Sequence, residues 1–287
     1  MTATRHPLLA FFGHHKCATK FVLAILKQIC TDCGLRLLTI SSAKQVDGNV
    51  RDLIAKSRAD VLAYMNAWWD HRQSLEDVRG FHMVRDPRDL LVSAYFSHLH
   101  SHETRGWEAL PAHRESLKDL SKEDGLMLEM DFCEPVFQAM RKWNYQDENI
   151  LELRFERLVS DPYQSFIDIC QHLGLLREES NMPSRILFRC KSMLNRCYRF
   201  GSGPLPMRWR SRWIPAERML SAVYNNRFEK RAGGRSPGQE NIQHHFRKGT
   251  PGDWNNHFSV RHTREFNHRY GDLLEKLGYS ERSSAAA

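Results

Sequence analysis

A glycine-led loop with two lysines and a threonine comes directly after the first apolar run of this sequence. The run is Leu8–Phe12 and the loop is Gly13–Lys20, in which Lys16, Thr19 and Lys20 supply two cations and a hydroxyl. A helix predicted to follow would point its free backbone N–H groups and the positive end of its dipole at the same place. These groups together indicate a site for a phosphate or a sulfate.

Two further segments carry cations at positions suited to anion binding. Arg85 opens Arg85–Asp89 directly after the apolar run Gly80–Val84, and Ser93 follows two helical turns later. Farther along, Arg247–Phe258 begins with two adjacent cations before a glycine, which suits the wrapping of an anion. Because ligands bind beyond the carboxyl ends of the strands in an open α/β sheet, Arg85 is expected at the same edge as the first loop.

Strands that alternate with helices are predicted to position these segments. Short apolar runs predict strands at Leu8–Phe12, Leu35–Ile40, Val61–Asn66, Gly80–Val84 and Ile150–Phe155. Helical spacing of apolar residues predicts helices over 21–33, 87–95, 126–143, 162–173 and 260–277, and a mostly helical, basic stretch over 183–228. The fold class is therefore α/β: a single domain over residues 1–282, with a mainly parallel central sheet flanked by helices and a P-loop-like loop after the first strand.

Two segments are predicted to lie outside this framework. His98–Glu123 is polar and rich in histidine, so we expect a surface loop that contains a short helix. Residues 283–287 are small and are predicted to form a disordered tail.

Composition narrows the class of protein. The chain has 287 residues, of which 41% are hydrophobic and 26% charged, as in a globular protein. Its apolar runs are shorter than the ~20 residues that span a bilayer, and its first residues lack a signal-peptide pattern, so we expect a cytoplasmic protein without a membrane partner. In a cytoplasmic protein the seven cysteines are expected to be reduced thiols. The net charge of +8 favours an anionic ligand.

Three segments resemble the signature segments of PAPS-dependent sulfotransferases of the cytosolic or bacterial small-molecule type. They are Gly13-His-His-Lys-Cys-Ala-Thr-Lys20, Val84–Ser97 and Phe246–Phe258, and their order and spacing match as well. The third is the most specific, because few other families carry Arg-Lys-Gly with Gly-Asp-Trp downstream. The resemblance implies transfer of a sulfuryl group from PAPS to a hydroxyl or amine of a small-molecule acceptor, with release of PAP and without a metal.

The resemblance also assigns residues to PAPS, which carries a 5′-phosphosulfate and a 3′-phosphate. The phosphosulfate-binding loop would consist of His15, Lys16, Cys17, Ala18, Thr19 and Lys20, with Phe21 stacked on adenine. Lys16 would be catalytic, in contact with the bridging oxygen and the leaving phosphate. The 3′-phosphate ligands would be Arg85, Ser93, Arg247, Lys248 and Gly249, and further nucleotide contacts would come from Phe155, Asn226 and Phe228. We interpret Asp86 and Asp89 as partners that orient Arg85 or Arg88.

The general base is where the sequence departs from the family. Many members keep a histidine after the middle strand, where this chain has Asn66, and an amide cannot take a proton at neutral pH. The candidates for replacement are Asp70, His71 and the group His98, His100 and His102. We favour His100, because this group follows the helix that carries Ser93.

Other readings of the anion-binding segments are weaker. A nucleotide kinase or ATPase needs Gly-Lys-Ser/Thr after the first glycine, and the chain has Ala18-Thr19-Lys20 instead. A nucleic-acid-binding protein would interleave basic and aromatic residues along one face, which this sequence does not do. A glycan or lipid acceptor is an open alternative to a small molecule, and the sequence identifies neither the acceptor nor the oligomeric state.

Overall fold

The computed structural model describes residues 6–41, 45–46, 49–176, 181–200 and 209–280, so the predicted tail at 283–287 lies outside the described residues. The chain divides into two compact units that are each built from separate stretches of sequence. The first unit contains residues 1–14, 18–83 and 144–227, and the second contains 15–17, 84–143 and 228–287.

A five-stranded sheet forms the centre of the first unit. Its strand order is β2 (Leu37–Ile40), β3 (Val61–Tyr64), β1 (Leu8–Gly13), β4 (Val78–Val84) and β5 (Ile150–Arg154). β1 runs parallel to both β3 and β4, and β2 runs parallel to β3. The residues of β1 after Leu8 are buried without alternation, as expected where both faces of a parallel sheet are covered. The predicted α/β class with a mainly parallel sheet is confirmed.

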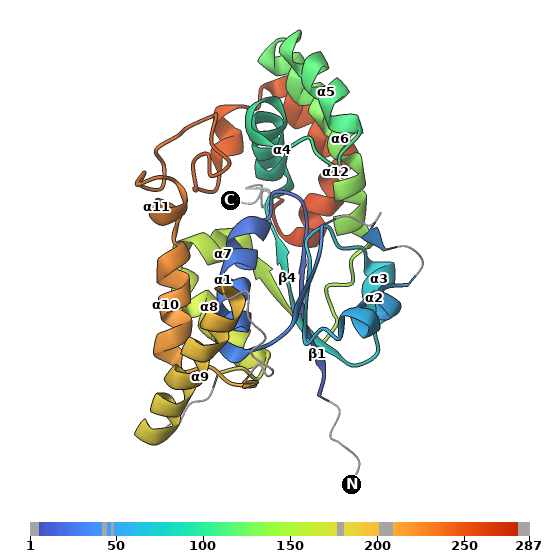
Figure 1. Ribbon diagram of the computed structural model, residues 1–287. Coiled ribbons are helices and arrows are strands. Elements are labelled where there is room, and N and C mark those ends of the chain that lie inside the picture. Colours follow the sequence, from blue (N-terminus) through green and yellow to red (C-terminus); the bar gives the residue numbers. More distant parts are fainter. Residues whose placement is uncertain (1–5, 42–44, 47–48, 177–180, 201–208, 281–287) are drawn as a thin grey trace, which may run out of the picture. The chain divides into compact units, whose positions relative to one another are not determined.

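Helices cover both faces of this sheet (Figure 1). One face carries α1 (Thr19–Cys33), α7 (Phe155–Ser160), α8 (Pro162–His172), α9 (Met182–Phe200) and α10 (Ala216–Asn226), and the other carries α2 (Val50–Ser57) and α3 (Trp69–Gln73). The predicted helix after the first loop is confirmed as α1, which packs against both α9 and α10. Its apolar residues recur at helical spacing and are buried.

A buried carboxylate joins three of these helices. Asp32 of α1 is fully buried and accepts hydrogen bonds from Ser192 Oγ (2.9 Å) and Arg196 Nε (2.7 Å) of α9, and from Arg218 Nε (2.8 Å) of α10. Burial costs a charge its hydration and raises the pKa of Asp32, and the two guanidinium groups offset part of that cost. Asp32 therefore fixes the rotation of α9 about its own axis.

The second unit is helical. It contains α4 (Pro87–Phe96), the π-helix η2 (Ser97–Ser101), α5 (Ala109–Lys118), α6 (Lys122–Lys142), α11 (Phe228–Arg231), the 3₁₀-helix η3 (Asp253–Asn256) and α12 (Val260–Leu277). α6 packs against both α4 and α12. Val92, Tyr95, Leu117 and Leu126 form a buried apolar cluster that joins α4, α5 and α6. Within the described ranges, no helix has the length and apolar character needed to cross a membrane.

The prediction of a surface loop with a short helix over His98–Glu123 is confirmed only in part: residues 102–108 lie outside any helix and α5 is the short helix, but other parts of the segment are helical or buried. The segment forms η2, α5 and the start of α6, and the side chains of His98, His113 and Leu117 are buried. The polar composition suggested exposure, but Glu129 of α6 provides hydrogen-bond partners for both histidines inside the protein. Polar residues enter a protein core when such partners are present.

Gly34 is required at the end of α1, and its replacement is our first prediction. Gly34 has φ 65°, and a Cβ there would lie 2.6 Å from the carbonyl oxygen of Trp209. We expect Gly34→Ala to lower the free energy of unfolding by about 1–3 kcal/mol. The matched control is Gly271→Ala in α12, where a Cβ meets nothing within 4 Å. This change should raise the free energy of unfolding by at most about 1 kcal/mol. Equal effects of the two changes in urea denaturation would contradict this account.

Candidate active site

The loop between β1 and α1 contains two non-glycine residues with positive φ. Lys16 and Ala18 both adopt left-handed conformations, with φ of 63° and 56°. Ala18 is the N-cap of α1 and offers no side-chain hydrogen bond to the first N–H groups of the helix. These N–H groups are therefore suited to an anion. The side chain of Cys17 is fully buried, so only its backbone could contact a ligand.

Arg85 links this loop to α4. Its Nη1 donates to the carbonyl oxygen of Lys16 (3.4 Å), and its Nη2 lies 3.8 Å from Asp89 Oδ2. Ser93 follows Asp89 at helical spacing, is half-buried, and its hydroxyl has no hydrogen-bond partner among the described residues. The structure thus brings the predicted residues Lys16 and Arg85 together within the second unit.

Two buried aspartates order the arginines of this region, as we interpreted from the sequence. Asp86 caps α4 by accepting from Arg88 N (2.9 Å) and also binds the Arg88 guanidinium (2.8 Å). That guanidinium lies 3.8 Å from the ring centroid of Trp254. Asp89 accepts hydrogen bonds from the backbone of Gly252 (2.6 Å) and Trp254 (2.9 Å). Asp89 therefore fastens the third segment to the helix that follows Arg85.

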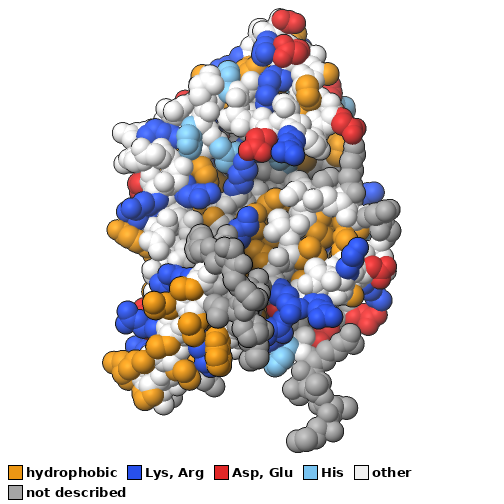
Figure 2. Space-filling view, viewed as in Figure 1, with side chains coloured by type: hydrophobic (Ala, Val, Ile, Leu, Met, Phe, Trp, Pro, Cys, Tyr) orange, Lys and Arg blue, Asp and Glu red, His pale blue; other side chains and the backbone are white. Residues whose placement is uncertain are grey.

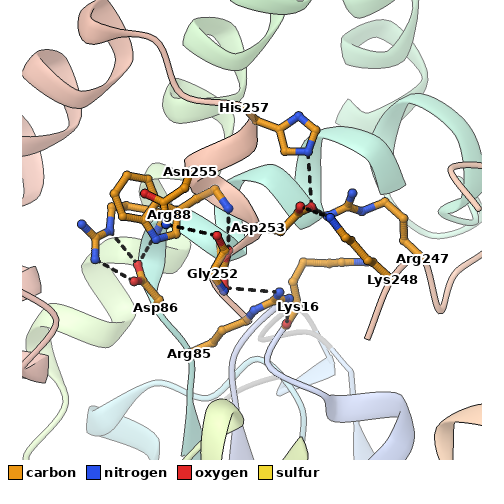
Figure 3. A network of polar contacts seen from close by, with 12 residues as sticks. Lys16, Arg85, Asp86, Arg88, Arg247, Lys248, Gly252, Asp253, Asn255 and His257 are labelled. Carbon is orange, nitrogen blue, oxygen red and sulfur yellow. Dashed lines mark hydrogen bonds and ion pairs between the residues drawn. The ribbon is translucent and has the colours of Figure 1, made fainter. Parts of the chain in front are cut away.

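The cations of the third segment converge on Asp253 (Figure 3). Asp253 is buried and accepts hydrogen bonds from Arg247, Lys248, Asn256 and His257. Burial acts to raise the pKa of Asp253, but these hydrogen bonds together outweigh it and hold the pKa far below its usual range. The carboxylate is therefore ionised and keeps the two cations in place.

Arg247 retains a donor for a ligand. Its Nη1 binds Glu240, its Nη2 binds Asp253, and its guanidinium lies 4.6 Å from the ring centroid of Phe96. Its Nε is buried and has no hydrogen-bond partner among the described residues. A buried donor without an acceptor is costly, and a phosphate oxygen would satisfy it. The residues present thus fit the 3′-phosphate that the resemblance implies.

Gly249 is required by its own backbone and by a neighbouring ring. It has φ 74°, and a Cβ would lie 2.5 Å from the ring of Phe228. Nearby, Arg235 donates to the carbonyl oxygens of Phe246 (2.6 Å) and Arg247 (2.8 Å). The glycine-rich stretch 233–238 is therefore tied to the third segment by the Arg235 side chain.

A chain of hydrogen-bonded histidines starts next to Lys16. His15 Nε2 lies 2.9 Å from His98 Nε2, and His98 Nδ1 lies 2.7 Å from Glu129 Oε1. The other carboxylate oxygen of Glu129 lies 2.8 Å from His113 Nε2. Glu129 is fully buried in the middle of α6. Sequence reasoning did not identify Glu129 or His113; a carboxylate on the buried face of a predicted helix was the signal available.

The pKa directions assign the protons in this chain. Burial alone would raise the pKa of Glu129, but hydrogen bonds from His113 and His98 and their charges bring it below its usual value. Burial lowers the pKa of His98, more than Glu129 raises it. Burial also lowers the pKa of His15, and the neighbouring His98, Lys16, His102 and His245 lower it further. Near neutrality Glu129 is therefore an anion and both His15 and His98 are neutral.

These charge states fix the tautomers. Since Glu129 can only accept, His98 carries its proton on Nδ1 and presents Nε2 as an acceptor. His15 must then donate from Nε2, which leaves its Nδ1 as the nitrogen that can take a proton. Aromatic rings surround His15, with ring centroids at 5.4 Å for Trp107 and 5.3 Å for His102.

The favoured base, His100, lacks such a partner. It is half-buried, its Nδ1 lies 3.4 Å from Gln243 Nε2, and among the described residues no carboxylate is within hydrogen-bond distance. Burial and the charge of Arg114 lower its pKa. The other candidates, Asp70 and His71, lie in α3 of the first unit, where His71 Nδ1 is 2.7 Å from the Tyr64 hydroxyl.

Among the remaining predicted nucleotide contacts, Phe228 belongs to the second unit and the others to the first. Phe21 in α1 packs edge-on against Phe166, with ring centroids 6.3 Å apart. Phe155 begins α7, and the side-chain amide of Asn226 donates to Ala222 O (2.9 Å) and Gln28 Oε1 (3.3 Å). Thr19 and Lys20 form the first turn of α1. No contact described here tests their predicted roles, which stay predictions.

The mainly parallel sheet, with a loop and a helix after its first strand, gives this chain an α/β architecture. Residues 71–278 match the family described as the sulfotransferase domain. The chain therefore belongs to the sulfotransferase family. No curated protein sequence matches it.

Solved sulfotransferase-like structures share the fold. The chain is similar to a mouse sulfotransferase, SULT7A1, solved with PAP, at 17% identity and a TM-score of 0.53, covering 98% of this chain and 87% of that one. It is also similar to retinol dehydratase with retinol and PAP, at 14% identity and a TM-score of 0.51, covering 99% and 84%. It is similar as well to retinol dehydratase with androsterone and inactive cofactor PAP. The identity is 15% and the TM-score 0.50, and the match covers 99% of this chain and 83% of that one.

The second prediction concerns Asp89. Asp89→Asn keeps the volume but removes the charge and one of the two acceptors, so either Gly252 N or Trp254 N loses its partner. We expect the free energy of unfolding to fall by about 2 kcal/mol in urea denaturation. The control is Asp119→Asn at the exposed end of α5, which should change it by less than about 0.5 kcal/mol. A stability loss no larger than that of the control would show that Asp89 does not fasten the third segment.

Proposed function

We propose that this sulfotransferase uses PAPS as its donor, acts on a hydroxyl or amine of a small-molecule acceptor, and releases PAP. The observation that carries the proposal is the buried Arg247 Nε, which has no hydrogen-bond partner within the described part of the chain and is followed in the sequence by Lys248 and Gly249. Asp89 joins this segment to Arg85, and Arg85 contacts Lys16. One unit thus holds cations for both ends of a molecule with two anionic groups.

The reaction follows from the charges involved. The acceptor oxygen or nitrogen forms a bond to sulfur, the bond from sulfur to the bridging phosphate oxygen breaks, and the acceptor proton leaves. Negative charge grows on the departing phosphate, and the Lys16 ammonium would stabilise it. Donors fixed in place before the reaction act most strongly on such charge.

The 3′-phosphate is unchanged by the reaction, and its ligands differ accordingly. Arg85, Ser93, Arg247 and Lys248 would hold it through charge and hydrogen bonds. Asp253 and Glu240 already bind the cations of the third segment. They orient those cations, so the phosphate adds to the network at Arg247 Nε and at the Ser93 hydroxyl.

The third prediction tests the donor. PAP should raise the melting temperature of the protein by mass action, because it binds only the folded state. AMP lacks the 3′-phosphate and should raise it much less at the same concentration. Arg247→Gln should remove the difference between PAP and AMP, whereas Arg105→Gln at an exposed position should keep it. Equal stabilisation of the unmodified protein by PAP and AMP would refute a 3′-phosphate site.

We also propose that His15, rather than His100, takes the acceptor proton. His15 precedes Lys16, and its Nδ1 is the nitrogen that the tautomers leave able to accept. His98 and Glu129 act as positioning residues, because their hydrogen bonds fix the His15 tautomer. When His15 becomes an imidazolium, its Nε2–H still donates to His98, and the Glu129 carboxylate offsets the new charge.

The fourth prediction is a pH dependence. A base must be unprotonated, so kcat/KM should fall as the pH drops through the pKa of His15, below the ordinary histidine value of about 6.5. His15→Ala should cost on the order of 10²–10⁴-fold in kcat with an aliphatic alcohol and abolish this acid limb. Glu129→Gln should cost less in kcat and shift the limb, which a purely structural role would not do.

The controls separate this proposal from its rivals. His100→Ala should keep both kcat and the acid limb; the loss of both in this variant alone would restore His100 as the base. His98, His113 and Glu129 also have the side chains of a metal site, with ligand atoms within 4.8 Å of one another. Activity that EDTA removes and zinc restores would show a metal centre in place of the relay.

A further inference from the structure

Helix α9 has three distinct faces around its axis. Successive residues of an α-helix are separated by about 100°, which allows each side chain to be assigned to one face. The first face points into the first unit and contains Phe188, Ser192 and Asn195, all of them buried. Ser192 binds Asp32, and Asn195 binds the backbone of both Asp32 and Trp209. This face fixes which side of α9 points outward.

The second face is apolar and exposed. It comprises Met182, Ile186, Leu187, Cys190, Met193, Leu194 and Cys197. Met182 and Met193 are 67% and 68% exposed, and Ile186 and Leu187 are 56% and 55% exposed. Figure 2 shows these apolar side chains gathered over α9 at the lower left of the view. A contiguous apolar patch of this kind marks an interaction surface, because exposed apolar side chains are otherwise scattered.

The third face consists of basic residues along both borders of the apolar one. Arg185, Arg189 and Arg196 border one side, and Lys191 borders the other. The sequence of α9 contains no aspartate or glutamate. Beside Lys191 lies Trp209, 44% exposed, with the ammonium 5.6 Å from its ring centroid. Tryptophan is enriched where an apolar phase meets water.

We propose that α9 docks on an anionic lipid surface, with its axis in the plane of the membrane. An apolar face bordered by cations is the pattern of helices that lie in the interface, where lysine and arginine reach the headgroups. Arg196 is held by Asp32, which it shares with Arg218, and Arg185 lies 3.8 Å from Glu217, so Arg189 and Lys191 supply the charge for lipid phosphates. Docking of this kind would revise the sequence expectation of no membrane partner, and the anionic cytoplasmic leaflet has the lipid charge that it requires.

A second copy of the chain is a poorer occupant of this face. Two α9 helices packed against each other would bring their arginines and lysines together without an acidic residue from either helix. Like charges at such a border oppose association. Charge complementarity therefore favours a lipid surface, and dimerisation becomes an outcome that the experiment can detect.

Vesicle sedimentation of the full-length protein tests the proposal. We expect binding to vesicles of phosphatidylcholine mixed with phosphatidylserine, little binding to phosphatidylcholine alone, and weaker binding as salt is raised. The triple variant Ile186→Ser, Leu187→Ser and Met193→Ser should bind at least about tenfold more weakly. The double variant Arg189→Glu and Lys191→Glu should also lose about tenfold or more.

The matched control replaces three exposed apolar residues of the second unit. Leu120→Ser, Ile242→Ser and Val260→Ser remove side chains that are 40%, 39% and 86% exposed. This variant should bind vesicles like the unmodified protein, and both triple variants should keep the melting temperature. The proposal would be overturned if the unmodified protein did not bind the anionic vesicles, or if the α9 triple variant and the control triple variant lost vesicle binding equally. A dimer in analytical ultracentrifugation that only the α9 triple dissociates, without vesicle binding, would assign this face to a second copy.

Discussion

The carboxylate of Asp89 is the interaction on which the candidate site depends. It accepts the backbone N–H groups of Gly252 and Trp254 and faces the guanidinium of Arg85. The start of α4 and the third segment are more than 150 residues apart in the sequence. Asp89 therefore joins the backbone of the third segment to the start of α4, where Arg85 lies.

The same arrangement of acid beside base recurs at the other functional groups. Asp253 holds Arg247 and Lys248, Asp86 holds Arg88, and Glu129 holds two histidines. Each carboxylate is largely buried, so its charge is screened little by water and acts strongly on its neighbours. The net charge of +8 is therefore a poor guide to the site, where acidic and basic groups are paired and orientation matters more than the sum of charges.

Under the proposed function, the general base lies at a different position in the sequence from the histidine of many family members. Asn66, at the expected position of the base, donates to the carbonyl oxygen of Ser41 and takes no proton. His15, directly before Lys16, instead carries a tautomer set by His98 and Glu129.

The sequence by itself determined the α/β class, the parallel strands, the loop before α1 and the family, because these follow from apolar periodicity and from short contiguous motifs. It also paired Asp86 and Asp89 with arginines correctly, since both pairs are local to α4. Only the tertiary structure decided that His98 and His113 are buried, because their partner Glu129 lies on another helix. It likewise decided which face of α9 is exposed, since Asp32 of α1 fixes that rotation. Contacts between residues far apart in sequence leave no periodic signal, and in this protein such contacts set the protonation of the site.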